Sequence, residues 1–304
     1  MFKVAGAIFL VVLIWGYTWV TMKIGLSYIP PFLFSAFRLL IGAIPIFLIL
    51  MLLKKPLLPD KKKITNVLVM SVLMSLGYLA TLTYGMQFVD SGQSSVLVYT
   101  MPIFVTLIAH FTINERLTSF KIIGICLGTV GILFILGPQF LNFNAQTVTG
   151  ELLIIVAAIS WACANVFSKV KFSGSDIMNM TAWQLLIGAI MLFVISFITE
   201  NVSQTEWNQQ AVLSLLFNGI FSTAVTFIAW FWVLTKIEAS LASMTLMAVP
   251  ILGLFFGWLQ LNETLTINIL AGAFLICIGI FFAANKNRRK DLVKDTLEYQ
   301  VRHR

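Results

Sequence analysis

Arg38 is the one charged residue that lies well inside a long apolar stretch of this 304-residue chain. A guanidinium in such a position could bind the carboxylate or phosphate of a solute. It could instead extend toward the polar end of the stretch, or donate hydrogen bonds to backbone carbonyls of a neighbouring helix. The residue type alone favours the structural role, and anion binding stays open as the alternative.

The 12 acidic residues lie in loops, in the C-terminal tail or at the ends of apolar stretches. A carboxylate in the middle of a membrane is costly, and ion-coupled carriers commonly keep one there for the coupling ion. None takes that position in this sequence. The pattern therefore disfavours a carboxylate that couples transport to protons or sodium, and it also disfavours paired carboxylates for acid–base catalysis.

The cysteines and histidines give no sign of a metal site or a nucleophile. Cys126, Cys163 and Cys277 each lie in an apolar stretch without CxxC spacing, and His110 and His303 are far apart. A disulfide framework or a zinc site needs closer and more regular spacing. We expect no catalytic residue, no metal and no cofactor.

Polar and aromatic side chains recur in the middle of several apolar stretches. Tryptophan and tyrosine usually gather at membrane interfaces, and Tyr78 and Trp230 lie deeper than that rule predicts. Aromatic faces offer a large contact area and can hold a cation, while an asparagine offers both a donor and an acceptor. Core packing is the competing interpretation for each. The candidate substrate-binding residues are Trp15, Thr18, Trp19, Tyr78, Tyr99, Asn165, Thr226 and Trp230.

The elements that position these residues are membrane helices. Hydrophobic residues make up 59% of the chain and charged residues 11%, against about 45–50% and about 25% in soluble domains. Roughly 20 apolar residues cross a bilayer as a helix, and the stretches are too long and too continuously apolar for a membrane barrel. The sequence predicts an all-α integral membrane protein with ten spans, near residues 4–22, 32–53, 64–86, 92–111, 120–136, 152–168, 177–198, 211–234, 240–259 and 267–284.

The basic residues predict how these spans are oriented. If the N-terminus is cytoplasmic, all of the 20 lysines and arginines except Lys23 and Arg38 fall in loops or tails on the cytoplasmic side. This is the positive-inside pattern. It predicts a protein of the plasma (inner) membrane with both termini on the cytoplasmic side. The net charge of +8 therefore reflects orientation rather than nucleic-acid binding.

The two halves of the chain resemble each other. An offset of 146 residues aligns Trp15 with Trp161 and Lys23 with Lys169. The same offset aligns residues 37–44 with 183–190, and an offset of 148 aligns Pro102 with Pro250 and residues 114–118 with 262–266. A colinear set that includes tryptophan and proline indicates an internal duplication.

Each repeat contains five predicted helices, which is an odd number. Two such repeats in tandem enter the membrane from opposite sides and are related by an axis in the membrane plane, with a solute site expected between them near the midplane. The predicted division is a first repeat at 1–138, an outer loop at 139–149, a second repeat at 150–285 and a basic cytoplasmic tail at 286–304.

These features resemble the EamA-like members of the drug/metabolite transporter superfamily. The resemblance covers residues 4 to 284 and departs from the pattern at Gln184, which stands where Arg38 would repeat. It implies a solute exporter or facilitator with a central cavity; substrates across the superfamily include amino acids, sugars, nucleotides and amphipathic toxicants. The motifs that carry it are Trp15-Gly16, Phe37-Arg38-Leu39-Leu40, Pro102 followed by Glu115-Arg116-Leu117-Thr118, and Pro250 followed by Glu263-Thr264-Leu265-Thr266.

We expect a carrier that works by alternating access on amino acids or related metabolites, without coupling to a proton or sodium gradient. Its cavity should lie between the repeats, with helix kinks at Pro102 and Pro250. The fifth and tenth helices should be peripheral and could form a homodimer through glycines such as Gly124 and Gly128. The partners expected are therefore a small-molecule substrate, the lipid bilayer and a second copy of the chain.

Three alternatives remain at this point. An exporter of amphipathic cations would use the same aromatic residues. A channel would share the topology, and saturable counterflow would distinguish it from a carrier. An intramembrane enzyme would need a nucleophile–base pair, a metal cluster or paired carboxylates, and the sequence supplies none of these within the spans.

The orientation can be tested with single cysteines in a background without native cysteines. We expect an impermeant thiol reagent to label Phe143→Cys and Gln204→Cys in intact cells, because both positions lie in predicted outer loops that lack basic residues. Lys62→Cys and Lys290→Cys should react only after permeabilisation. Labelling of Lys62→Cys in intact cells would overturn the predicted orientation.

Overall fold

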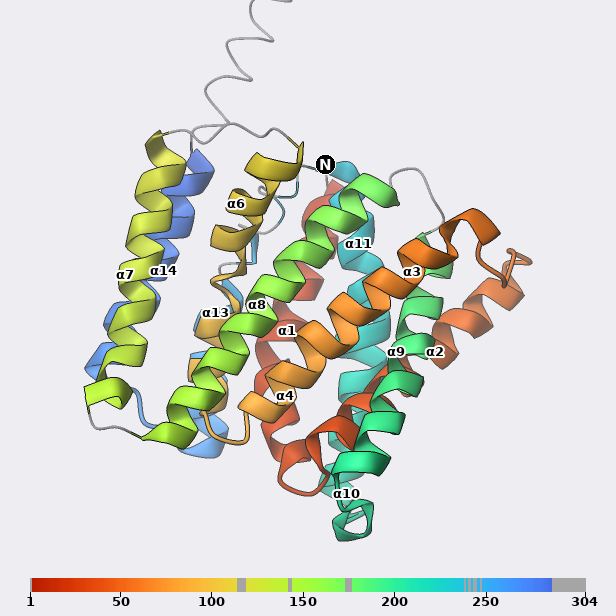
Figure 1. Cartoon of the computed structure of the whole chain (residues 1–304), viewed down its shortest axis with the longest axis horizontal. Coiled ribbons are helices and arrows are strands. Elements are labelled where there is room, and N and C mark those ends of the chain that lie inside the picture. Colours follow the sequence, from red (N-terminus) through yellow and green to blue (C-terminus); the bar gives the residue numbers. More distant parts are fainter. Residues whose placement is uncertain are drawn as a thin grey trace, which may run out of the picture.

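The computed structural model describes residues 2–113, 119–141, 144–172, 177–237 and 248–285, together with residues 239, 242, 245 and 246. Throughout these residues every regular element is a helix (Figure 1). Seven helices in the described part are long and apolar enough to cross a membrane, and three shorter apolar helices accompany them. The all-helical, membrane-type fold is thus confirmed at this level. The predicted tail at 286–304 and the first copy of the Glu-x-Leu-Thr motif, at 115–118, lie outside the described residues.

The first half of the chain supplies four long spans and one shorter apolar helix. Pro31 stands at the first turn of α2, where its missing N–H has no intrahelical partner to lose. The segments α3, η2 and α4 are continuous and form one span. The elements are α1 (Phe2–Leu26), α2 (Pro31–Leu52), η1 (Lys61–Lys63), α3 (Ile64–Ser71), η2 (Val72–Ala80), α4 (Thr81–Gly85), α5 (Ser91–Val98), α6 (Met101–Ile113) and α7 (Ser119–Leu141).

The second half follows the same order. Asparagine side chains cap two of its helices: Asn144 accepts from Thr147 N at the start of α8, and Asn208 accepts from Ala211 N at the start of α10. The segments α10, η4 and α11 are again continuous. The elements are α8 (Ala145–Lys171), α9 (Ile177–Thr199), η3 (Val202–Gln204), α10 (Gln209–Leu216), η4 (Phe217–Val225), α11 (Thr226–Lys236), α13 (Ala248–Leu261) and α14 (Ile267–Asn285).

A wide helical turn occurs at the corresponding place in each half. The third span is π-helical over Val72–Ala80, and its counterpart is π-helical over Phe217–Val225. Both segments have nine residues, and they are separated by nearly the offset that relates the two halves in sequence. Segments of this kind are rare and frequently occur at functional sites. They place small and polar side chains from both halves near the centre of the bundle.

The fourth span is interrupted just before Pro102. Helix α5 ends at Val98 and α6 begins at Met101, because the proline lacks an N–H and its ring excludes the carbonyl of Val98 from the helical pattern. The backbone N–H and the hydroxyl of Thr100 both donate a hydrogen bond to the carbonyl of Leu97. Where the sequence predicts a kink, the structure has a short break. Pro250 lies in the first turn of α13.

Helices α7 and α14 pair at one edge of the molecule (Figure 1). A Cβ atom on Gly131 would lie 2.7 Å from the carbonyl oxygen of Gly272, and one on Gly279 would lie 2.6 Å from the carbonyl oxygen of Gly124. The glycines therefore let the two backbones touch. Within the described residues they are used inside one chain, and a homodimer through these helices stays a prediction.

Gly131→Ala should destabilise the fold. The new methyl group would meet backbone atoms of α14, which cannot move as a side chain can, and overpacking of this kind costs about 1–3 kcal/mol. Gly6→Ala in α1 is the matched control, since nothing lies within 4 Å of its Cβ position. Denaturant unfolding in detergent measures both variants. Equal unfolding free energies for the two would contradict close packing of α7 on α14.

Candidate functional site

Two tryptophans at equivalent positions meet at the centre of the molecule. Trp15 of α1 and Trp161 of α8 have ring centroids 5.3 Å apart and nearly perpendicular planes. Tyr78 and Tyr99 also pack on Trp161, at 5.0 and 5.8 Å, and Trp230 lies 5.7 Å from Trp15. The aromatic residues that the sequence predicts for the site thus form one cluster, drawn from both halves of the chain.

A small cavity lies within this cluster, with a volume of about 10 Å³. That is roughly the space that one water molecule needs. A solute the size of an amino acid cannot occupy it, so the described conformation is closed at its centre. The lining residues are Trp15, Thr18, Trp19, Met22, Arg38, Tyr78 and Tyr99; the sequence predicts all of them except Met22.

Arg38 is buried, with 2% of its surface exposed. Its guanidinium donates to Thr223 Oγ1 at 2.8 Å and to Ser222 Oγ at 3.2 Å, and it contacts the sulfur of Met22 at 3.2 Å. Each of these partners is neutral. Among the described residues the guanidinium thus binds side chains rather than backbone carbonyls, and its burial keeps it off the surface of the molecule. The two structural roles that the sequence favoured were extension to a polar end and hydrogen bonds to backbone carbonyls.

Two indole N–H groups in the same cluster find no acceptor among the described residues. Trp19 Nε1 and Trp161 Nε1 are both buried and unpartnered. A buried donor left in this way costs about 1–3 kcal/mol, and such groups in a native structure call for an explanation. Together with Arg38 they make the centre of the molecule rich in donors and poor in acceptors.

The other three predicted substrate-binding residues, Asn165, Thr226 and Trp230, do not line the cavity. Trp15 Nε1 donates to Thr226 Oγ1 at 2.9 Å. Trp230 Nε1 donates to Asn165 Oδ1 at 3.1 Å, and Asn165 Nδ2 points to the sulfur of Met101 at 3.3 Å. Both functional ends of the Asn165 amide are thus used within the protein. In this conformation it positions Trp230 rather than facing a solute.

Ser222 is a residue that the sequence analysis missed. It lies in η4, accepts from Thr18 Oγ1 at 2.7 Å and from Arg38, and its carbonyl accepts from Trp15 Nε1 at 3.2 Å. The consecutive hydroxyls of Ser222 and Thr223 in an apolar stretch were the available signal. Only the π-helical turn brings both of them toward α1 and α2.

Carboxylates seal the end of the bundle that the sequence predicts to face outward. Glu263 accepts from Ser91 N at 2.7 Å and Gly92 N at 2.9 Å, at the start of α5. Glu200 makes the same contact at the start of α2, with Phe32 N at 2.7 Å and Leu33 N at 2.9 Å. Negative charge is favourable at a helix N-terminus. In both cases a residue of the second half caps a helix of the first.

Lysines close two loops in equivalent ways. Lys23 Nζ donates to the carbonyls of Met86 and Val89, the latter at 2.6 Å. Lys169, its counterpart in the second half, donates to the carbonyl of Ile237 at 3.0 Å. The equivalence of these contacts extends the sequence repeat into three dimensions.

Asp90 stands at the N-cap position of α5 but makes no capping hydrogen bond of its own, because Glu263 takes that role. Partial burial raises the pKa of Asp90 above its usual value, the neighbouring Glu263 raises it further, and Lys23 opposes the change. Two carboxylates and one ammonium group, from three separate segments, therefore gather at the end of the bundle that the sequence predicts to face outward.

Glu151 departs from what the sequence analysis expected of the acidic residues. It lies near the start of α8, as predicted for a helix end, yet its surface is fully buried. Gln93 Nε2 donates to one carboxylate oxygen, and the other oxygen has no hydrogen-bond partner among the described residues. A buried carboxylate therefore exists at the interface of the two halves, two turns from the helix end.

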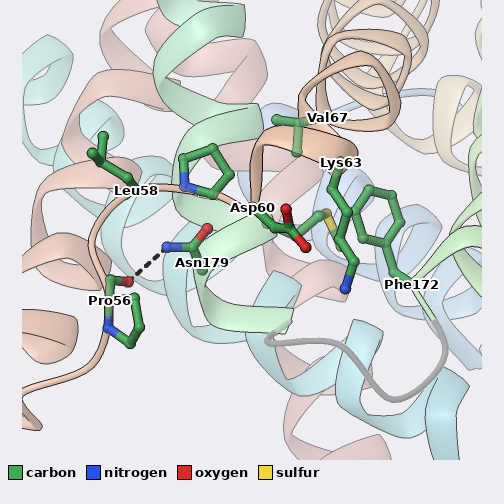
Figure 2. Close-up of a pocket in the computed structure, with 9 residues that line it drawn as sticks. Pro56, Leu58, Asp60, Lys63, Val67, Phe172 and Asn179 are labelled. Carbon is green, nitrogen blue, oxygen red and sulfur yellow. Dashed lines mark hydrogen bonds between the residues drawn. The ribbon is translucent and has the colours of Figure 1, made fainter.

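A cleft of about 290 Å³ opens at the opposite, lysine-rich end of the bundle. Figure 2 shows it between the α2–α3 connection and the start of α9, where Asn179 Nδ2 donates to the carbonyl of Pro56 at 2.8 Å. Val67 lines it and lies about 16 Å along the third span from Tyr78 at 1.5 Å per residue. The predicted site residues lie outside this cleft.

The EamA-like transporter family model matches residues 3–137 and again residues 148–285. The chain belongs to this family. The resemblance noted from the sequence motifs is thereby confirmed, and with it the assignment as a multi-pass membrane transporter. The two matched segments lie close to the predicted repeats, while the exact domain boundaries stay a prediction.

Relatives of similar length support the assignment. The chain is 58% identical over 281 residues to the uncharacterized transporter YoaV of Bacillus subtilis, covering 92% of this chain and 96% of that one. It is 30% identical over 281 residues to a probable amino-acid metabolite efflux pump of Salmonella typhimurium, covering 90% and 91%. A crystal structure with 19% identity superposes with a TM-score of 0.72 over 92% of this chain and 96% of that chain. This last likeness shows the fold alone.

Glu263→Gln should lower the unfolding free energy of the purified protein. The amide has one acceptor oxygen in place of the charged pair that binds two N–H groups at the start of α5, and hydrogen bonds to charged groups contribute about 1.5–3 kcal/mol. Glu206→Gln, at an exposed position of the loop between α9 and α10, is the control. Should both variants unfold with the same free energy as the parent protein, the cap does not hold the two halves together.

Proposed function

We propose that this protein is a carrier that exports, or equilibrates, small organic solutes bearing a carboxylate, such as amino acids and related metabolites. The observation that carries this proposal is the buried guanidinium of Arg38, which faces the central cavity and whose hydrogen-bond partners in the described part of the chain are all neutral. A solute carboxylate bound there would supply the missing negative charge.

The energetics favour this role over a purely structural one. Removing a charged group from water costs several kcal/mol unless a well-placed counter-charge and hydrogen bonds compensate. Two hydroxyls and a thioether compensate Arg38 only in part, and the unpartnered N–H groups of Trp19 and Trp161 add unused donors nearby. An anion that entered the cluster would satisfy several of these donors at once.

The aromatic walls indicate the rest of the substrate. Trp15, Trp19, Tyr78 and Tyr99 offer apolar faces for a side chain of some bulk, and aromatic rings also attract an ammonium group. A zwitterion with an apolar side chain fits this combination better than a hydrophilic sugar does. The similarity to a relative named as a probable amino-acid metabolite efflux pump points the same way.

Transport requires the closed centre to open to each side in turn. The repeated pairs Trp15–Trp161 and Lys23–Lys169 support two five-helix repeats of inverted orientation, which would rock about the cluster. This topology counts the three shorter apolar helices as spans, giving ten in all. The basic residues support both termini on the cytoplasmic side of the plasma membrane.

In this arrangement the described conformation is sealed on the outside and hollowed toward the cytoplasm. Glu200, Glu263 and Glu151 join the two halves at the outer end, whereas the cleft beside Asn179 opens at the inner end. We propose facilitated diffusion or exchange as the driving mode. Coupling to a proton gradient is the alternative mode, and buried Glu151 is a carboxylate that could carry the proton in it.

An exporter of amphipathic cations is the second candidate, since tryptophan and tyrosine faces also suit a cation. The buried positive charge of Arg38 opposes it, because a cationic solute in this cavity would be repelled. A channel is disfavoured by the nearly filled centre of the bundle. The aromatic cluster alone would not distinguish these possibilities; Arg38 does.

Arg38→Gln should abolish the preference for substrates with a free carboxylate. The test is counterflow in proteoliposomes with a pool of labelled amino acids and the corresponding methyl esters, which lack the negative charge. Charge-assisted hydrogen bonds contribute about 1.5–3 kcal/mol, so apparent affinity for the acids should fall about tenfold to a hundredfold, with little change for the esters.

Lys62→Gln provides the control, because it removes one positive charge at an exposed position of a loop that lies away from the cavity. Thermal unfolding of Arg38→Gln checks that the fold is intact. If the variant transports free acids with unchanged affinity, Arg38 does not bind the substrate carboxylate.

A further inference from the structure

A further hollow in the described part of the protein lies away from the central cluster. It has a volume of about 790 Å³ and lies between α1, α9 and α11. Ala7 of α1, Ile177 of α9 and Trp232 of α11 contribute to its walls. None of the predicted substrate-binding residues lines it. We name this hollow the lateral crevice.

One end of the lateral crevice is positively charged. Lys55 and Lys236 line it, and the Lys236 ammonium lies 5.9 Å from the centre of the Trp232 ring. Thr235 adds a hydroxyl beside them. In the orientation proposed above, this end lies at the level of the cytoplasmic headgroups.

The walls below the lysines are apolar over the depth of one leaflet. Ile228 and Ala229 line the lateral crevice, and so does Val225, which is 11 residues before Lys236 on the same continuous span. At 1.5 Å per residue, that separation is about 16 Å. Half of a bilayer hydrocarbon core is about 15 Å. The crevice therefore has the polarity and the length of a single lipid.

We propose that the lateral crevice binds one anionic phospholipid of the cytoplasmic leaflet, with its phosphate between Lys55 and Lys236 and an acyl chain along Ile228 and Val225. Basic pockets between membrane helices on the cytoplasmic side suit anionic headgroups. A free phosphate or a soluble anion would leave the apolar walls uncovered, so the chemistry selects a lipid. The proposal rests on the cytoplasmic placement of the lysines and not on the identity of the transported solute.

Such a lipid would contact α11, which belongs to the span that also carries two residues of the central site. The span of α11 continues into η4, where Ser222 and Thr223 hold the Arg38 guanidinium. Filling the lateral crevice would stabilise the packing of this span against α1 and α9. The lipid would then add to the stability of the closed conformation without entering the substrate path.

Native mass spectrometry and thermal unfolding of the purified full chain in detergent test the proposal. Phosphatidylglycerol should bind in a 1:1 complex and raise the melting temperature, while phosphatidylcholine should bind more weakly. The double variant Lys55→Gln/Lys236→Gln should lower the affinity for phosphatidylglycerol about 30-fold, because each lysine near the surface contributes about fivefold. Lys61→Gln/Lys62→Gln, with two lysines of the same cytoplasmic loop that lie outside the crevice, should bind as the parent protein does.

A second variant tests the apolar walls. Ala229→Phe places a phenyl ring against the apolar wall of the lateral crevice, where the acyl chain would lie, and should weaken phosphatidylglycerol binding with both lysines still in place. Folding of each variant is checked by its melting temperature without lipid. The proposal is overturned if phosphatidylcholine binds equally, if sn-glycerol 3-phosphate alone gives the same stabilisation, or if the crevice and control lysine variants behave alike. Each of these results is independent of whether amino acids are transported.

Discussion

A positive charge buried between the two halves of the chain requires hydrogen-bond acceptors from the helices around it. Arg38 keeps its guanidinium away from water only because Ser222 and Thr223 lie close enough to accept from it, and these hydroxyls depend on the π-helical turn over Phe217–Val225. Ser222 is further tied to α1 through Thr18 and Trp15. The aromatic cluster, the wide turn and the buried charge are thus one connected arrangement, in which the charge has no partner of opposite sign among the described residues.

The two halves of the chain share a pattern of helices and of several residues, but some of their charged residues differ. Tryptophans, lysines, prolines and π-helical segments recur at nearly constant offset, so both halves pack in the same way. Two other charged groups do not recur: Arg38 corresponds to Gln184, and Glu200 corresponds to Lys54. In the described conformation, Glu200 and Glu263 of the second half cap helices of the first half at one end of the bundle, and clefts lie at the lysine-rich end.

Close backbone contact has a related role at the periphery. Helices α7 and α14 meet through glycines that leave carbonyl groups of one helix against the backbone of the other. Attraction between apolar surfaces is weak inside a membrane, where lipid tails are equally apolar, so small residues that allow close packing become the main source of adhesion. Figure 1 shows this pair at one edge of the bundle. The residues that line the central cavity belong to other helices.

The sequence by itself determined the membrane class, the internal duplication, the family and most of the residues of the central cluster, because apolar run length, repeated tryptophans and isolated polar residues are local properties of the chain. Only the tertiary structure decided which partners those residues have. It placed Arg38 against Ser222 rather than at a surface, used both ends of the Asn165 amide within the protein and buried Glu151 against Gln93. The physical reason is that a polar group in a bilayer must find its partner across helices, and residues far apart in sequence become neighbours only when the helices pack.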